Sequence, residues 1–246
     1  GFVPISTIGA DFYPMIKQMA ATEGASTSEP FCAKDGEELT ENTDGSATCV
    51  MRFDAATGWL VGEPNRGLTA MFVMMNAARL QVGTQGVAIA ERAYQQALYF
   101  ARERRQGTAL DAPKGAPMSP ILVHPDVRRM LMEMRAKTQG ARAIAYQVAE
   151  ALDRSHREPV EAARKAAAER AAILTPVAKA YATDIGVEVA STGIQIHGGM
   201  GYAEETDVSR YFVDARVLSI FEGAEETLAL KVIARGLVDA ALSQTP

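Results

Sequence analysis

From Leu68 onward the chain is dominated by long runs of Ala, Met, Leu, Arg and Glu, which are good helix formers, with few helix breakers between them. In the first run, apolar side chains recur at the three- and four-residue spacing of one helix face. They are Leu68, Phe72, Met75, Leu80, Val87, Tyr94 and Leu98. Gly107 stops this run, so the pattern predicts one long helix over residues 68–105.

The helical pattern continues toward the C-terminal end, interrupted where Pro and Gly gather. Residues 107–123 hold several of both and are predicted to form a loop. Pro125 and Pro159 suit the first turn of the next two helices. The later helices are predicted at 125–155, 159–196, 204–217 and 225–241, with a turn at 197–202. Long helices joined by loops predict a mainly α protein, a four-helix up-and-down bundle with an appended fifth helix.

The first part of the chain, residues 1–66, has a different composition and is rich in turn-forming residues. Two short β-prone stretches, Thr48–Phe53 and Gly58–Val61, flank a predicted turn. We therefore expect a partial β-rich segment at 1–66 followed by a helical bundle domain at 67–246.

Composition and charge exclude several classes of protein. The 246 residues are 48% apolar with a net charge of −5, and the basic residues are dispersed, so nucleic-acid binding is not expected. Only Cys32 and Cys49 are present, and no His and Cys lie at metal-ligand spacing, so neither disulfides nor a metal site is expected. No run suits a membrane span or a signal peptide, so we expect a cytoplasmic protein.

The segment from Gln195 to Tyr202, Gln-Ile-His-Gly-Gly-Met-Gly-Tyr, closes the predicted helix 159–196. Its glycines permit positive φ and close approach of the backbone to a ligand, which suits the phosphate of an adenine nucleotide. An ordinary glycine-rich helix end is the alternative.

Arg104, Arg105, Gln106 and Gly107 stand at the end of the first predicted helix. A guanidinium there can grip a pyrophosphate through paired hydrogen bonds. The alternative is a solvated basic helix end, which the helix dipole favours.

Glu222 stands between Phe221 and Gly223, after an apolar run from Val217 to Ile220. A carboxylate in these surroundings is predicted to be partly desolvated, which suits a general base. A capping or surface glutamate is the alternative.

In this order, the three motifs resemble the C-terminal domain of the acyl-CoA dehydrogenases. The resemblance runs from about Gly45 to Arg235, and the spacing from Arg79 through Arg92 to Arg104 follows the family pattern without a gap. The methylthiopropionyl-CoA dehydrogenase branch is the most similar in its motifs. Those motifs are Leu174-Thr175-Pro176, Thr183-Asp184 and the 197–202 turn.

The resemblance implies roles for individual residues. Glu222 is implied as the catalytic base, and Arg79 and Gly223 as substrate-binding residues. The residues implied to bind FAD are Arg104, Gln106, Gln195, Ile196, His197, Gly198, Gly199 and Ala224. In the family the Arg104 and Gln195 motifs serve the FAD of a neighbouring subunit, which implies a homodimer or homotetramer. The segment 1–66 is then a remnant of the family's middle domain.

The implied function is FAD-dependent dehydrogenation of an acyl-CoA thioester to a trans-2-enoyl-CoA in fatty acid metabolism. Glu222 would take the α-proton, and an electron-transfer flavoprotein or a similar acceptor would take the electrons. Gly107 directly after Gln106, and Ala224 in place of a threonine, depart from the family pattern. A fragment or divergent member of the family therefore remains an interpretation of the chain.

Two other classes of protein remain open. A non-catalytic helical assembly module would keep the bundle after losing flavin binding. A ferritin-like di-metal bundle needs two Glu-x-x-His pairs on facing helices, and the helical approximation to one is Asp153 with His156.

Overall fold

The computed structural model describes residues 57–60 and 62–232, and the chain divides into two compact units, Gly1–Met75 and Asn76–Pro246. In the first unit, residues 57–60 are irregular, and a turn in which the Arg66 N–H donates to the Glu63 carbonyl (3.3 Å) precedes the first described helix. The predicted strand Thr48–Phe53 lies outside the described residues. The predicted strand Gly58–Val61 is wrong for Gly58 to Leu60, because a strand requires a paired neighbour and no described residue supplies one.

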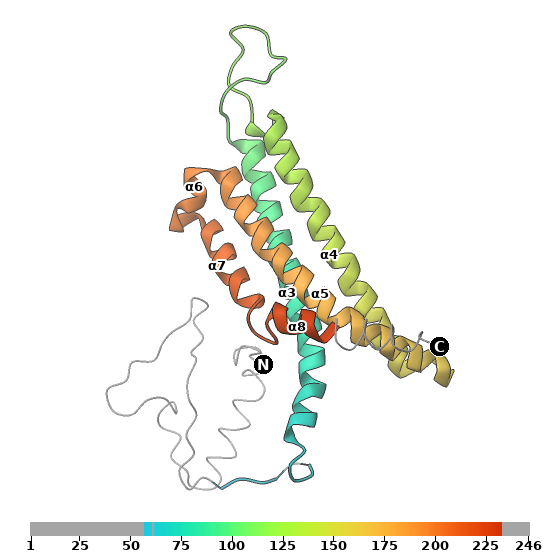
Figure 1. Cartoon of the computed structure of the whole chain (residues 1–246). Coiled ribbons are helices and arrows are strands. Elements are labelled where there is room, and N and C mark those ends of the chain that lie inside the picture. The colour runs from blue at the N-terminus through green and yellow to red at the C-terminus, as the bar shows by residue number, and fades with distance from the viewer. Residues whose placement is uncertain (1–56, 61, 233–246) are drawn as a thin grey trace, which may run out of the picture. The chain divides into compact units, whose positions relative to one another are not determined.

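The second unit is the predicted up-and-down bundle (Figure 1). Its elements are α3 (Gly67–Glu103, which begins in the first unit), η1 (Ile121–Val123), α4 (Pro125–Arg157), α5 (Glu161–His197), α6 (Gly199–Tyr202), η2 (Glu204–Thr206), α7 (Val208–Leu218) and α8 (Glu225–Val232). The long helices α3, α4 and α5 alternate in direction, and α7 returns along α5 (Figure 1). The mainly α prediction is confirmed, and the three long helices begin and end within a few residues of their predicted bounds.

Two predicted boundaries change because of single backbone conformations. Gly198, with φ +59°, ends α5 and reverses the chain, so residues 199–202 form the one-turn helix α6 instead of an open turn. Asp207, with φ +57°, splits the predicted helix 204–217 into η2 and α7. The predicted helix 225–241 is present as α8 over its described residues.

Small residues let α3 and α5 approach backbone to backbone. A Cβ added to Gly86 would lie 2.4 Å from the Ala182 carbonyl oxygen, and one added to Gly186 would lie 3.2 Å from the Gly86 carbonyl oxygen. The shared core is accordingly rich in alanine, filled out by larger side chains such as Val87, Leu131 and Met134. This tight crossing fixes the register in which residues of α3 face residues of α5.

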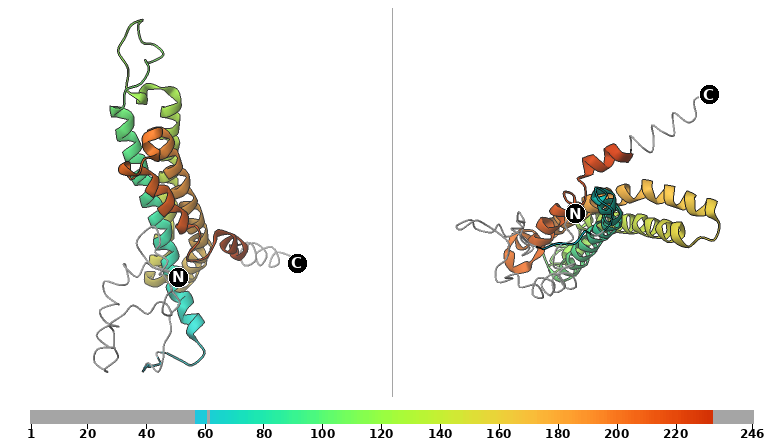
Figure 2. Two further views of the ribbon diagram at one scale, coloured as in Figure 1. Left: turned by 90° about the vertical axis from the view of Figure 1, so that its left-hand side faces the viewer. Right: turned by 90° about the horizontal axis from the view of Figure 1, so that it is seen from below.

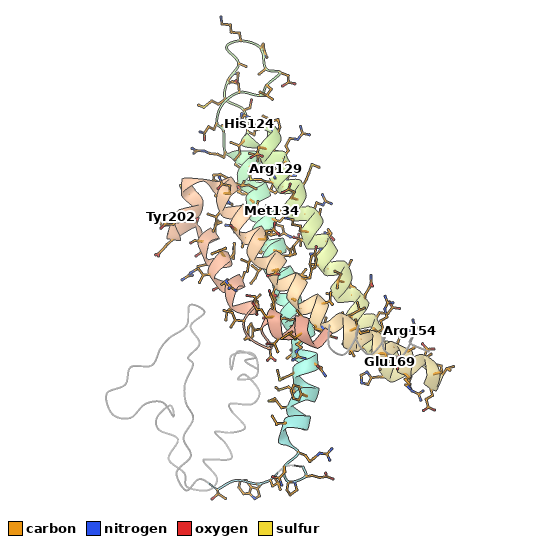
Figure 3. All side chains as sticks on the ribbon, viewed as in Figure 1. His124, Arg129, Met134, Arg154, Glu169 and Tyr202 are labelled. Carbon is orange, nitrogen blue, oxygen red and sulfur yellow. The ribbon has the colours of Figure 1, made fainter. Side chains whose placement is uncertain are left out.

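The helices α4 and α5 lie side by side along most of their length (Figure 2). Met134 of α4 points into the bundle and is buried, whereas Tyr202 of α6 points into solvent (Figure 3). Among the described residues, no helix is long and apolar enough to cross a membrane.

Candidate active site

The segment Phe221–Ala224 forms a tight turn between α7 and α8. The Phe221 N–H donates to the Val217 carbonyl at 3.2 Å, and the Leu228 N–H donates to the Ala224 carbonyl at 3.0 Å, so both helices anchor the turn. Between these anchors Glu222 has φ +59° and Gly223 has φ +102°. A residue other than glycine in the left-handed region costs about 1–3 kcal/mol and persists where its surroundings hold it.

Glu222 is almost fully buried, with 3% of its surface exposed and both carboxylate oxygens shielded from solvent. The surface-glutamate interpretation does not fit this burial. The space beside Gly223 is tight, because an added Cβ would lie 3.2 Å from Leu228 Cδ2 and 3.4 Å from Arg79 Nη2. The turn therefore favours glycine at this position for its conformation, and the close packing adds to that preference.

Two buried cations from different helices hold consecutive carbonyl groups of this turn. Arg79 of α3 donates from Nε to the Glu222 carbonyl at 3.1 Å, and Lys179 of α5 donates from Nζ to the Gly223 carbonyl at 3.0 Å. Burial lowers the pKa of Arg79, and the negative charge of Glu222 opposes that shift. Burial also lowers the pKa of Lys179, while the Glu225 carboxylate raises it and the charge of Arg79 lowers it further.

Arg79, predicted as a substrate-binding residue, thus contacts the backbone of the predicted base, and its Nη1 donates to Asn76 Oδ1 at 3.1 Å. Sequence reasoning missed Lys179. The signal was a single lysine inside the otherwise apolar stretch Pro176–Ala182, where a solvated charge is not expected.

Glu225 begins α8 next to the turn, where the N-terminal end of the helix favours a negative charge. Its Oε1 accepts a 2.7 Å hydrogen bond from the hydroxyl of Thr183 on α5. Burial raises the pKa of the Glu225 carboxyl, the Thr183 hydroxyl lowers it, and neighbouring Asp184 raises it. Together with the two cations, these groups join α3, α5 and α8 around the Glu222 turn.

The Gln195–Gly199 motif lies at the far end of α5 and divides into an inner and an outer part. Ile196 and His197 are buried; the His197 ring stacks on Phe100 at a centroid distance of 4.4 Å and its Nδ1 bonds the Gly193 carbonyl at 2.7 Å. Burial lowers the pKa of His197, and the bond to the Gly193 carbonyl opposes that shift. Gln195, Gly198 and Gly199 are exposed.

Arg104, Gln106 and Gly107 are also exposed, at the start of the loop after α3. Backbone hydrogen bonds hold the two ends of this loop together. The Ile121 N–H donates to the Arg104 carbonyl at 2.8 Å, and the Gln106 N–H donates to the Ser119 carbonyl at 3.0 Å. His124, at the top of α4 (Figure 3), bonds the Gln106 carbonyl through Nε2 at 2.8 Å. The backbone of this motif is therefore fixed while the Arg104 side chain faces solvent.

The structure brings some of the predicted site residues together and keeps others apart. Arg79, Glu222, Gly223 and Ala224 meet around the α7–α8 turn. Lys179, which contacts this turn, and Gln195 are separated by 16 positions of one helix, or about 24 Å at the α-helical rise per residue. Among residues 57–60 and 62–232, no cluster of three His, Cys, Asp or Glu side chains is arranged to hold a metal ion.

Comparison with known proteins decides the family. Residues 65–238 match the model of the acyl-CoA dehydrogenase C-terminal domain. The chain belongs to the acyl-CoA dehydrogenase family. The resemblance seen in the sequence motifs is thereby confirmed.

Relatives in this family share substantial identity with the chain. It is 46% identical over 230 residues, 90% of its length, to the 3-methylmercaptopropionyl-CoA dehydrogenase of Ruegeria pomeroyi, which agrees with the branch that its motifs resemble. It is 34% identical over 200 residues, 78% of its length, to the broad-specificity linear acyl-CoA dehydrogenase FadE5 of Mycobacterium tuberculosis. The chain spans 38% and 33% of the lengths of these two acyl-CoA dehydrogenases.

A solved structure of the same family has the same fold. The acyl-CoA dehydrogenase of Bacillus anthracis, determined in complex with FAD, superposes with a TM-score of 0.72 at 25% identity. The match covers 90% of this chain and 38% of that one.

Proposed function

We propose that the protein containing this chain catalyses the FAD-dependent α,β-dehydrogenation of an acyl-CoA thioester to a trans-2-enoyl-CoA, with Glu222 as the base. The observation that carries the proposal is the buried carboxylate of Glu222 in a left-handed turn whose carbonyl groups are held by Arg79 and Lys179. Strained backbone of this kind concentrates at active sites. A carboxylate shielded from water also has no full hydration shell to lose before it accepts a proton.

In this mechanism a carboxylate oxygen of Glu222 accepts the proton from the α-carbon of the thioester. The proton is only weakly acidic, so the negative charge that develops on the thioester oxygen needs hydrogen-bond donors, each worth about 3–4 kcal/mol. The family resemblance implies two such donors, of which the N–H of Glu222 belongs to this chain and the other would come from the ribose of FAD. The direction of the Glu222 N–H is set by the same turn that positions the carboxylate. FAD, when bound, supplies the acceptor for the hydride that leaves the β-carbon.

The exposed motifs fit the phosphates of FAD. The Arg104 guanidinium and the Gln195 amide are open to solvent, and added Cβ atoms at Gly198 and Gly199 would meet nothing within 4 Å, so a phosphate can approach this backbone closely. The Gln195 motif lies about 24 Å along α5 from the Glu222 turn. We therefore propose that these motifs serve the FAD of a second copy, in a homodimer or homotetramer.

The relatives suggest which substrate to test first. The Ruegeria pomeroyi relative is named for 3-methylmercaptopropionyl-CoA and the Mycobacterium tuberculosis relative for linear acyl-CoA substrates. We propose a short acyl-CoA of the first kind as substrate and an electron-transfer flavoprotein as the electron acceptor.

The test uses the purified protein after incubation with excess FAD and gel filtration. Retained oxidised flavin absorbs at about 450 nm, a property of the cofactor, and anaerobic 3-methylmercaptopropionyl-CoA should bleach it. Mass spectrometry should then find an acyl-CoA lighter by two hydrogens. Protein that assembles but retains no FAD would favour the assembly module instead. Protein that retains FAD but is bleached by neither this substrate nor butyryl-CoA would contradict the proposed reaction.

A further inference from the structure

Lys179 lies in the middle of α5 with 0% of its surface exposed, and the proposed proton transfer does not use it. A buried ammonium costs free energy that a hydrophobic side chain of similar size does not. Charged neighbours of Lys179 change this free-energy cost in both directions. The carboxylates of Glu225, Asp184 and Glu222 attract it, while the guanidinium of Arg79 repels it. The ammonium of Lys179 therefore belongs to the group of buried charges around the Glu222 turn.

The packing of α3 on α5 explains why the two cations meet at one turn. A Cβ added to Gly83 would lie 3.3 Å from the Ala178 carbonyl oxygen and 3.4 Å from Lys179 Cα. The backbone of α3 therefore contacts the backbone of α5 at Ala178 and Lys179. Arg79 lies one helical turn before Gly83 on α3. From this crossing, Arg79 and Lys179 reach the Glu222 and Gly223 carbonyls respectively.

Two consecutive carbonyl groups held from two helices fix the orientation of two consecutive peptide planes. The planes are those that follow Glu222 and Gly223, the residues with positive φ. Because each plane is rigid and the two planes meet at the Cα of Gly223, fixing both limits rotation of the backbone at Gly223, directly after Glu222. The Arg79 bond alone leaves the plane after Gly223 free to turn, and glycine is the residue that turns most easily.

We propose that Lys179 is a positioning residue of the active site, whose ammonium holds the Gly223 carbonyl and so keeps the Glu222 carboxylate aimed at the substrate. The proposal rests on the proposed function, because it is Glu222 as the base that needs to be aimed. Lys179 does not itself touch the reacting atoms.

Lys179→Met tests the role, since methionine has a similar length and removes only the ammonium and its hydrogen bond. Thr175→Val is the matched control: it lies one turn earlier on α5, is also buried, and its hydroxyl donates at 2.7 Å to the Ala171 carbonyl, away from the turn. The holoenzyme of each variant is compared with wild type. The measurements are the thermal midpoint, amide hydrogen exchange of peptides covering residues 219–228, the rate of flavin bleaching and the Kd for an unreactive acyl-CoA analogue.

For Lys179→Met we expect a lower thermal midpoint, because the Gly223 carbonyl loses its donor and the nearby carboxylates lose a cation. We also expect at least tenfold faster exchange in the 219–228 peptides and an unchanged Kd for the analogue. We expect bleaching to slow by about 10²-fold, the size of effect that a misplacement of about 1 Å produces. Thr175→Val should bleach flavin and exchange amides like wild type. A lower thermal midpoint with wild-type exchange and bleaching per folded molecule would overturn the proposal and make Lys179 a structural residue.

Failure of this proposal and failure of the proposed function give different results. If Glu222 is not the base, hydrogen exchange still reports whether Lys179 holds the turn, although no bleaching is seen in wild type. If Glu222 is the base but Lys179 does not aim it, wild type and Lys179→Met bleach at the same rate, which overturns the positioning role. Should Lys179→Met fail to fold, Lys179→Leu, which also removes the donor to the Gly223 carbonyl, is measured in the same way. Wild-type exchange and bleaching in that variant would also overturn the role.

Discussion

Arg79 donates a hydrogen bond of 3.1 Å to the carbonyl oxygen of Glu222, a residue 143 positions further along the chain. The bond is buried and joins α3, the first long helix, to the turn before α8. A buried hydrogen bond between residues so distant in sequence forms only when α3 and α5 have packed in the correct register. The geometry of the Glu222 turn therefore depends on the packing of the whole bundle.

Gly223→Ala should destabilise the protein and displace Glu222. The substitution puts a Cβ at φ +102° and 3.2 Å from Leu228 Cδ2, so the strain should cost about 1–3 kcal/mol. The midpoint of urea unfolding measures this loss. Gly199→Ala is the control, because its added Cβ meets nothing within 4 Å. Equal midpoints for the two variants would show that the turn tolerates a side chain.

Gly86→Ala should lower the stability of the protein, whereas Gly140→Ala should not. Its Cβ would lie 2.4 Å from the Ala182 carbonyl oxygen, so α3 and α5 have to move apart. Gly140→Ala on α4, whose nearest neighbour is Tyr181 Oη at 3.7 Å, should instead stabilise the helix by about 1 kcal/mol. Thermal unfolding of both variants checks the prediction. A Gly86→Ala protein as stable as wild type would contradict the close crossing of the helices.

The ion pair between Glu91 of α3 and Arg142 of α4, with an N–O distance of 2.7 Å, predicts a specific dependence of stability on pH. The hydrogen bond from Arg142 lowers the pKa of Glu91 below its ordinary value of 4.5. A carboxyl with a lowered pKa in the folded state binds fewer protons there than in the unfolded state. Its contribution to stability is thus complete above about pH 4.5 and is lost as the pH falls through the folded-state pKa.

Glu91→Gln should therefore be less stable than wild type at pH 7, and the difference should shrink as the pH falls below 4.5. Urea unfolding at several pH values measures it. Glu150→Gln, at an exposed ion pair within α4 with a distance of 3.8 Å, is the control and should show little difference at any pH. A Glu91→Gln deficit that stays constant with pH would contradict the electrostatic explanation.

Arg104→Ala should lower the affinity for FAD while leaving the stability of the folded protein nearly unchanged. The exposed guanidinium would lose a charge-assisted bond to phosphate worth about 1.5–3 kcal/mol, or roughly 10- to 150-fold in Kd. Arg105→Ala is the neighbouring control, because Arg105 Nη1 donates to the Met118 carbonyl at 3.2 Å within its own loop. Quenching of FAD fluorescence gives both constants. Equal affinities for Arg104→Ala and wild type would assign Arg104 to a solvated helix end.

Much of the bundle could be predicted because each long helix carries its own signals. The apolar spacing from Leu68, Pro125 at the start of α4 and the glycines after α5 are all local in sequence. The end of α5 at the glycines could be predicted, but the one-turn helix α6 and the break at Asp207 could not, because the single left-handed residues Gly198 and Asp207 decide them. The second predicted strand failed at Gly58 to Leu60 because local β propensity does not supply a pairing partner.

The candidate site could be predicted in part, because some of its residues are adjacent in sequence. Phe221, Glu222 and Gly223 are adjacent in sequence, so their motif is visible there. Lys179 is brought to them by the crossing of α3 and α5, and such a long-range contact leaves no local pattern beyond a lysine in an apolar stretch. The roles of Arg104 and the Gln195 motif toward FAD remain predictions.

The most direct test of the account is the rate at which anaerobic acyl-CoA bleaches the flavin of the Glu222→Gln holoenzyme. Glutamine keeps the size of the side chain but cannot accept the α-proton, so the rate should fall by about 10²- to 10⁴-fold. Flavin content and the Kd for an unreactive acyl-CoA analogue should stay at wild-type values. A Glu222→Gln protein that retains FAD and is bleached at the wild-type rate would show that the base is another residue and would contradict the account.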